Sequence, residues 1–126
     1  MAASKKKSEV KITFENNKLK EAYEKLPETE LLRKKIDTVI EKIRERPAFG
    51  QPIAKRLIPK EYRKKGIDNA FWVELSKGKG WRLIYSLKSF SEIKIVGIIL
   101  EWFTRHKDYG RRFGYSRRDN RSKTWI

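Results

Sequence analysis

The 126-residue chain contains no cysteine, a single histidine and no apolar run that approaches the ~20 residues of a membrane-spanning helix. The lack of cysteine excludes disulfides and thiol chemistry, and with one histidine it argues against a structural zinc site. Residues 1–7 are basic, but no apolar segment follows them, so no signal peptide is expected. We therefore expect a cytoplasmic protein with no membrane partner.

The familiar catalytic motifs are absent as well. The sequence has no glycine-rich phosphate loop, no dinucleotide fingerprint and no Ser/His/Asp set of recognisable spacing. Its few acids are scattered over predicted helices, so paired carboxylates for metal-assisted hydrolysis are not indicated, and neither a metal nor a cofactor is expected. The histidine that remains lies in a basic stretch, Arg105-His106-Lys107-Asp108-Tyr109. A lone histidine is more often a surface residue than a catalyst, and both interpretations stay open.

What the chain has in excess is positive charge. Lysine and arginine number 32 against 16 acids, which gives a formal net charge of +16. Such an excess favours a polyanionic partner, most often nucleic acid. Neutralisation by an acidic protein is the alternative, and the two are compatible.

Three apolar runs predict an antiparallel meander over residues 71–76, 81–88 and 92–103. Strand alternation puts Leu83 and Tyr85 on one face and Arg82 on the other, where Glu74 of the preceding strand also points. An arginine in mid-strand between apolar neighbours requires an acid, an anion or a wet groove, because a guanidinium is seldom buried unpaired. The second face is therefore expected to be an open one that carries charge.

The first half of the chain supplies a strand at 8–14 and two amphipathic helices, one from Asn16 to Pro27 and one from Thr29 to Arg46. The fold class predicted is α+β, a single βααβββ domain over 8–115 with the helical hairpin covering one face of an antiparallel sheet. Residues 1–7 and 116–126 are expected to be a disordered basic tail and an arginine-rich tail. The expected core comprises Leu32, Ile36, Val39, Ile40, Ile43, Leu83, Tyr85 and Ile95.

Two basic segments remain. Residues 47–69 form a long proline-containing connection, either a solvated connector or a functional loop. From residue 105 onward, basic residues alternate with aromatic ones, which suits single-stranded RNA because phosphates take the charge and bases stack. A solubilising tail with an aromatic anchor is the alternative.

In this order, the elements and three short motifs resemble the RelE/ParE superfamily of toxins from toxin–antitoxin pairs. Residues 80–85, GWRLIY, are similar to the family's glycine-aromatic-arginine strand. Residues 95–99 and 105–109 resemble its last strand and its histidine-to-tyrosine ending, and residues 50–57 its basic linker. The similarity covers about residues 8–115. The segment 100–104 is longer than the family pattern, so the register of the ending is open.

The resemblance implies a metal-independent endoribonuclease that cuts messenger RNA at the ribosome and is neutralised by an acidic antitoxin. In that chemistry the 2′-hydroxyl attacks the adjacent phosphate, and the protein stabilises a pentacovalent dianion. By resemblance Arg82 takes the phosphate clamp, Arg105 a second clamp, His106 the general acid and Tyr109 the stacking position. Glu74 is one candidate base, and Glu101 is an alternative occupant of the site.

Further RNA contacts are expected from Lys55 and Arg56 in the linker, Lys79 in the turn, and Arg111 and Arg112 after the histidine motif. The same fold also admits a gyrase-directed toxin and a nucleic-acid-binding module without catalysis. These alternatives make different use of the same basic surface.

Overall fold

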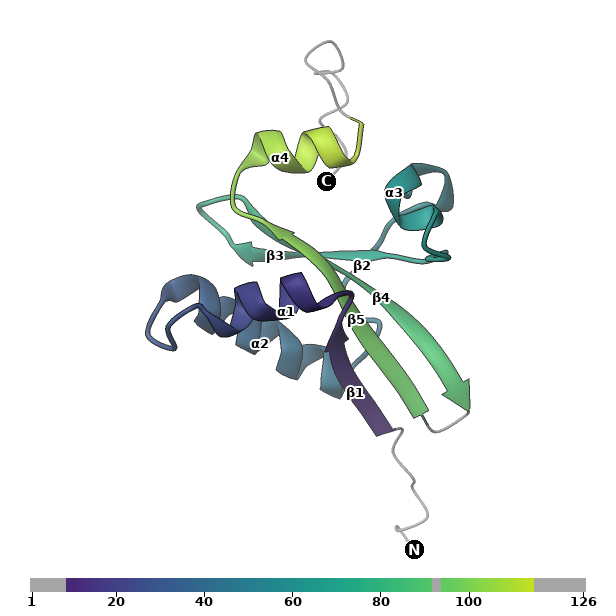
Figure 1. Cartoon of the computed structure of the whole chain (residues 1–126), viewed down its shortest axis with the longest axis horizontal. Helices are drawn as coiled ribbons and strands as arrows, with labels where there is room; N and C mark the ends of the chain where they lie inside the picture. Colours follow the sequence, from purple (N-terminus) through teal and green to yellow (C-terminus); the bar gives the residue numbers. More distant parts are fainter. Residues whose placement is uncertain (1–8, 92–93, 115–126) are drawn as a thin grey trace, which may run out of the picture.

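The computed structural model describes residues 9–91 and 94–114 (Figure 1). The predicted tails at 1–7 and 116–126 lie outside the described residues. The elements in chain order are β1 (Glu9–Phe14), α1 (Asn17–Glu24), α2 (Leu31–Glu45), β2 (Gln51–Pro52), the 3₁₀ turn η2 (Lys55–Leu57), α3 (Lys60–Arg63), β3 (Phe71–Ser76), β4 (Trp81–Ser91), β5 (Lys94–Phe103) and α4 (His106–Arg112).

One five-stranded sheet runs through the molecule in the order β1-β5-β4-β3-β2. The meander β3-β4-β5 is antiparallel, as predicted, whereas β1 lies parallel to β5. An interior place for the last strand was expected because it is apolar on both faces, and β5 does lie between β1 and β4. The α+β single-domain prediction is therefore confirmed at the level of class. The four-strand, two-helix arrangement was too simple, because β2, η2, α3 and α4 are added.

The first face of the sheet, which carries Leu83 and Tyr85, is covered by the helical hairpin of α1 and α2 (Figure 1). Asn16 caps α1, its side-chain oxygen accepting from the Leu19 amide at 2.8 Å. The two helices are joined by the Tyr23 hydroxyl, which donates to Asp37. Glu30 precedes α2 without a side-chain cap, so the helix begins two residues after its predicted start at Thr29.

The first core lies between this hairpin and the sheet. Six of the eight predicted core residues are buried, and the other two, Leu32 and Ile95, are half-buried. Tyr85 is fully buried, and its hydroxyl donates to the Pro47 carbonyl at 2.7 Å and accepts from the Gly50 amide at 3.0 Å. The side chain that fills this core therefore also fixes the turn after α2. The buried members are Ile36, Val39, Ile40, Ile43, Leu75, Leu83, Tyr85 and Ile99.

The second face of the sheet, which carries Arg82 and Ile84, is not open along its whole length. Segments 53–63 and α4 cover part of it and form a second core (Figure 1). The expectation of a wholly open face was wrong because the linker and the residues after β5 fold into short helices that bury aromatic side chains. The buried members are Ile58, Tyr62, Ala70, Ile84, Leu100, Phe103 and Tyr109.

Candidate nucleic-acid interface

The candidate site begins with a row of residues across three strands of the second face. Arg82 of β4 lies opposite Glu74 of β3 and opposite Phe103 of β5. Directly opposed residues of antiparallel strands share a face, so acid, guanidinium and ring lie side by side. In the next row of the same face, Ile84 lies opposite Trp72 and Glu101. The strand register thus places Glu74 beside Arg82, as the alternation predicted.

Arg82 lies against aromatic rings. Its guanidinium carbon is 5.0 Å from the centre of the Trp72 ring and 5.4 Å from that of the Tyr109 ring, within cation–π distance. Burial lowers the pKa of Arg82, while the charges of Tyr109 and Glu74 act in the opposite sense. An arginine remains protonated even so. A cation that has already lost part of its water interacts more strongly with an anion than a fully hydrated one does.

Helix α4 brings the histidine motif over the same end of the sheet. Tyr109 is buried, with 3% of its surface exposed, and its ring packs edge-on against Phe103 at 5.5 Å and stacks on Phe113 at 4.7 Å. His106 and Arg105 lie one turn before Tyr109, on the same side of the helix, and both are exposed. The structure therefore uses Tyr109 as the anchor of α4 and leaves Arg105 and His106 accessible at its beginning.

Asp108 holds two of the candidate arginines. Nε of Arg105 lies 3.0 Å from one carboxylate oxygen of Asp108, and Nη1 of Arg111 lies 3.4 Å from the other. The hydrogen bond from Arg105 lowers the pKa of Asp108. Both arginine side chains are largely exposed, at 63% and 71%, so these pairs lie at the surface and are weak. Arg105 and Arg111 can exchange this carboxylate for a phosphate.

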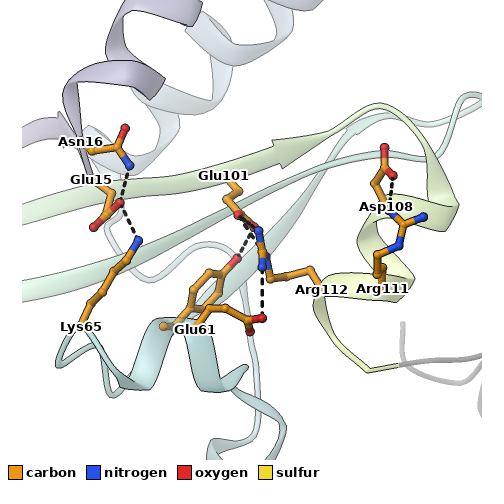
Figure 2. Close-up of polar contacts among 9 residues, drawn as sticks. Glu15, Asn16, Glu61, Lys65, Glu101, Asp108, Arg111 and Arg112 are labelled. Atoms are coloured by element: carbon orange, nitrogen blue, oxygen red, sulfur yellow. Dashed lines mark hydrogen bonds and ion pairs between the residues drawn. The ribbon is translucent and has the colours of Figure 1, made fainter.

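Arg112 is held much more firmly (Figure 2). Its Nε donates to Oε1 of Glu101 at 2.9 Å, and its Nη2 lies 2.8 Å from Oε2. Nη1 lies 3.3 Å from Glu61 of α3, and the Tyr62 hydroxyl donates to the same Glu101 at 2.9 Å. Burial is the main cause that raises the pKa of Tyr62, and the charge of Glu101 adds to it.

The other predicted RNA contacts are dispersed. Lys55 and Arg56 lie exposed on η2, and Lys55 lines a hollow of about 300 Å³ beside Arg63. Lys79 lies in the β3–β4 turn with its ammonium 5.6 Å from the centre of the Trp81 ring, which packs on the first core. The structure thus brings Glu74 and Tyr109 beside Arg82, with Arg105 and His106 at the beginning of the helix that carries Tyr109, and places Lys79 toward the other face.

Two contributors were missed in the sequence. Trp72 lies two residues before Glu74 in the same strand and therefore shares its face. The alternation of the strand could have identified it. Tyr62 gave no signal, because its four-residue helix lies in a charged, proline-bounded segment without periodicity. Both rings pack in or against the second core.

Among the described residues, no three His, Asp or Glu side chains are grouped so as to hold a metal ion. No helix in the described ranges is long and apolar enough to cross a bilayer. Comparison of the chain with protein-family models, with curated proteins and with solved structures gave no match.

Proposed function

We propose that this protein is a RelE-like toxin of a toxin–antitoxin pair, a metal-independent endoribonuclease that cuts messenger RNA at the ribosome in the cytoplasm. An acidic antitoxin is its proposed protein partner. The observation that carries the proposal is the juxtaposition of Arg82 with Glu74 on one face of the sheet, beneath the helix that begins with Arg105 and His106.

In this proposal the roles follow from position and chemistry. Arg82 binds the scissile phosphate, because its guanidinium presents a planar fork of donors to the equatorial oxygens of the dianion. Arg105 supports the same charge, and His106 gives its proton to the leaving 5′-oxygen. Glu74 takes the proton from the attacking 2′-hydroxyl. The net charge of +16 attracts the RNA backbone to this surface.

A second candidate is an RNA-binding module without catalysis. It is favoured by the burial of Tyr109, which cannot stack on a nucleotide from within the second core, and by the carboxylate partners of Arg105 and Arg111. The two candidates differ in what Arg82 does, because only a nuclease needs a fork of donors that is complementary to the transition state.

Two variants of Arg82 separate these candidates. Arg82→Lys keeps the charge but loses the bidentate fork, so RNA binding should persist while cleavage falls. Arg82→Ala should lose about 10²–10³-fold in rate, as expected for removal of one preorganised donor. The assay is cleavage of messenger RNA with and without ribosomes, together with growth arrest on expression. Arg44→Gln is a control, because Arg44 is an exposed arginine paired with Glu41 on α2.

Equal growth arrest by folded Arg82→Ala and wild type would remove Arg82 from the catalytic role. If wild type leaves messenger RNA intact under both conditions but binds it in a salt-dependent way, the module without catalysis is the correct assignment.

A further inference from the structure

Helix α4 is too short to hold itself in place. It has seven residues, whereas isolated helices shorter than about 12–15 residues are marginal in water. Arg105, its N-cap, makes no side-chain capping bond, and Gly110 within the helix is less favourable than alanine would be. The position of α4 must therefore come from its contacts with the rest of the molecule.

Two contacts at opposite ends of one helical turn supply that position. The Tyr109 ring packs on Phe103 of β5, and the Arg112 side chain reaches Glu101 of the same strand. Tyr109 fixes how deep the helix sits, because its ring is enclosed on several sides. A packed ring alone leaves the helix freer to rotate about its own axis. The bidentate arginine–carboxylate pair restricts that rotation, because its two hydrogen bonds have one geometry.

The Arg112–Glu101 pair is also partly buried. The side chains of Arg112 and Glu101 are 32% and 23% exposed, so solvent screens them less than the surface pairs of Asp108. Glu101 accepts the Tyr62 hydroxyl as well, and Arg112 also reaches Glu61, so α3, β5 and α4 meet at this point (Figure 2). Removal of one charge from such a group leaves the other partly buried and poorly compensated.

We propose that Arg112 and Glu101 are a positioning pair that orients α4 over Arg82, and that Arg112 is not a phosphate contact. The inference rests on the proposed function for its consequence in catalysis, but its structural half stands without it. Arg112 spends its donors on Glu101 and Glu61, whereas its neighbour Arg111 is 71% exposed and faces solvent. Two adjacent arginines thus have different tasks.

The contrast gives a sharp test in RNA binding. Each phosphate contact adds about 0.7 to the slope of log affinity against log salt for a single strand. Arg111→Gln should reduce the slope of a short single-stranded RNA by that amount. Arg112→Gln should leave the slope unchanged, and Arg44→Gln, on the other side of the sheet, should do the same. A slope that falls equally for Arg112→Gln and Arg111→Gln would overturn the proposal.

Cleavage gives the second readout. With RNA bound to saturation, Arg112→Gln should slow cleavage at least tenfold while the Michaelis constant changes little. Glu101→Gln, which still offers an acceptor to the Tyr62 hydroxyl, should do the same. If the two residues act as a pair, the double variant should lose no more than either single one. Additive losses, or an unchanged rate in the saturated complex, would contradict a positioning role.

A third measurement needs no RNA. The Phe113 amide donates to the Tyr109 carbonyl at 3.0 Å, so its hydrogen exchange reports on α4. Exchange at this amide should quicken in Glu101→Gln and Arg112→Gln, and should stay as in wild type in Arg44→Gln. If wild type does not cleave RNA, the nuclease assignment fails. Amide exchange and the salt slope would then still decide whether Arg112 and Glu101 position α4. If exchange is unchanged in both variants, the pair does not hold α4, and the inference is wrong.

Discussion

The cores on the two faces of the sheet differ in residue composition. The buried members of the first core, under α1 and α2, are aliphatic apart from Tyr85, and the aromatic rings packed against them are only partly buried. The second core, under α3 and α4, mixes the rings of Tyr62, Phe103 and Tyr109 with aliphatic side chains. Arg82 lies against its rings, and the Arg112–Glu101 pair lies beside it. Well-packed apolar residues would often stabilise such a core as well as an ion pair does. The charges on the second face are therefore better explained by what they bind and orient than by stability.

We expect first that the core under α1 and α2 contributes most of the stability of the fold. Ile43 is fully buried between α2 and the sheet, so Ile43→Ala should lower the free energy of unfolding by ~2–5 kcal/mol, through lost transfer energy and the cavity left behind. Urea unfolding measures this. Leu57→Ala is the control, because Leu57 is 42% exposed, and it should cost within about 0.5 kcal/mol. If Ile43→Ala lowered the free energy of unfolding by less than Leu57→Ala does, the first core would not be the main source of stability.

A smaller effect is expected where β5 passes beneath α2. A Cβ added at Gly97 would lie 3.1 Å from side-chain atoms of both Ile12 and Ile43, so neighbours from β1 and α2 would have to shift. Gly97→Ala should cost roughly 1–3 kcal/mol in urea unfolding, as overpacking does. Gly78→Ala is a matched control, because no atom lies within 4 Å of its added Cβ. Equal stability of the two variants would mean that the close approach at Gly97 is easily relieved.

The first face is also the part that the sequence predicted well, and the reason is periodicity. Helix α2 spans 15 residues with an apolar stripe, and the first part of β4 has an apolar residue at every second position from Trp81 to Leu87, so each pattern repeats several times. The elements added to the predicted fold are short. The β2 strand has two residues and α3 has four, which is too few for a period to appear. Their places depend on contacts with residues distant in the chain.

Part of the candidate site could be predicted from the sequence. An arginine among apolar strand residues marked Arg82, and alternation put Glu74 beside it. The rings against which Arg82 lies come from β3 and α4, and the meeting of those elements is a property of the tertiary fold. The separate roles of Arg111 and Arg112 were hidden for the same reason, since adjacent arginines look alike until the helix is placed.

The second face should respond to alkali through Tyr62, as the first should through Tyr85, whose pKa is also raised by burial. The pKa of Tyr62 is raised, chiefly by burial, so its contribution to stability is complete below the unfolded value of about 10 and is lost as pH rises above it. Stability measured by urea unfolding should fall beyond pH ~10 more steeply in wild type than in Tyr62→Phe. At neutral pH the variant should lose roughly 0.5–1.5 kcal/mol with its hydrogen bond to Glu101. If wild type and Tyr62→Phe lost stability equally at alkaline pH, the pH sensitivity would come from groups other than Tyr62.

The smallest effect is expected at the surface of the same face, where Asp108 lies between Arg105 and Arg111. The hydrogen bond from Arg105 holds the pKa of Asp108 below its ordinary value, so the stability it contributes is present above the unfolded value of about 3.9 and is lost as pH falls through the lowered one. A carboxyl titration by NMR should show the low midpoint in wild type and a rise toward the ordinary value in Arg105→Gln. Unfolding at neutral pH should barely change in that variant, because exposed pairs contribute little. If Arg105→Gln left the midpoint where it was, or destabilised the protein as much as Tyr62→Phe, the distinction between surface pairs and the half-buried Arg112–Glu101 pair would be lost.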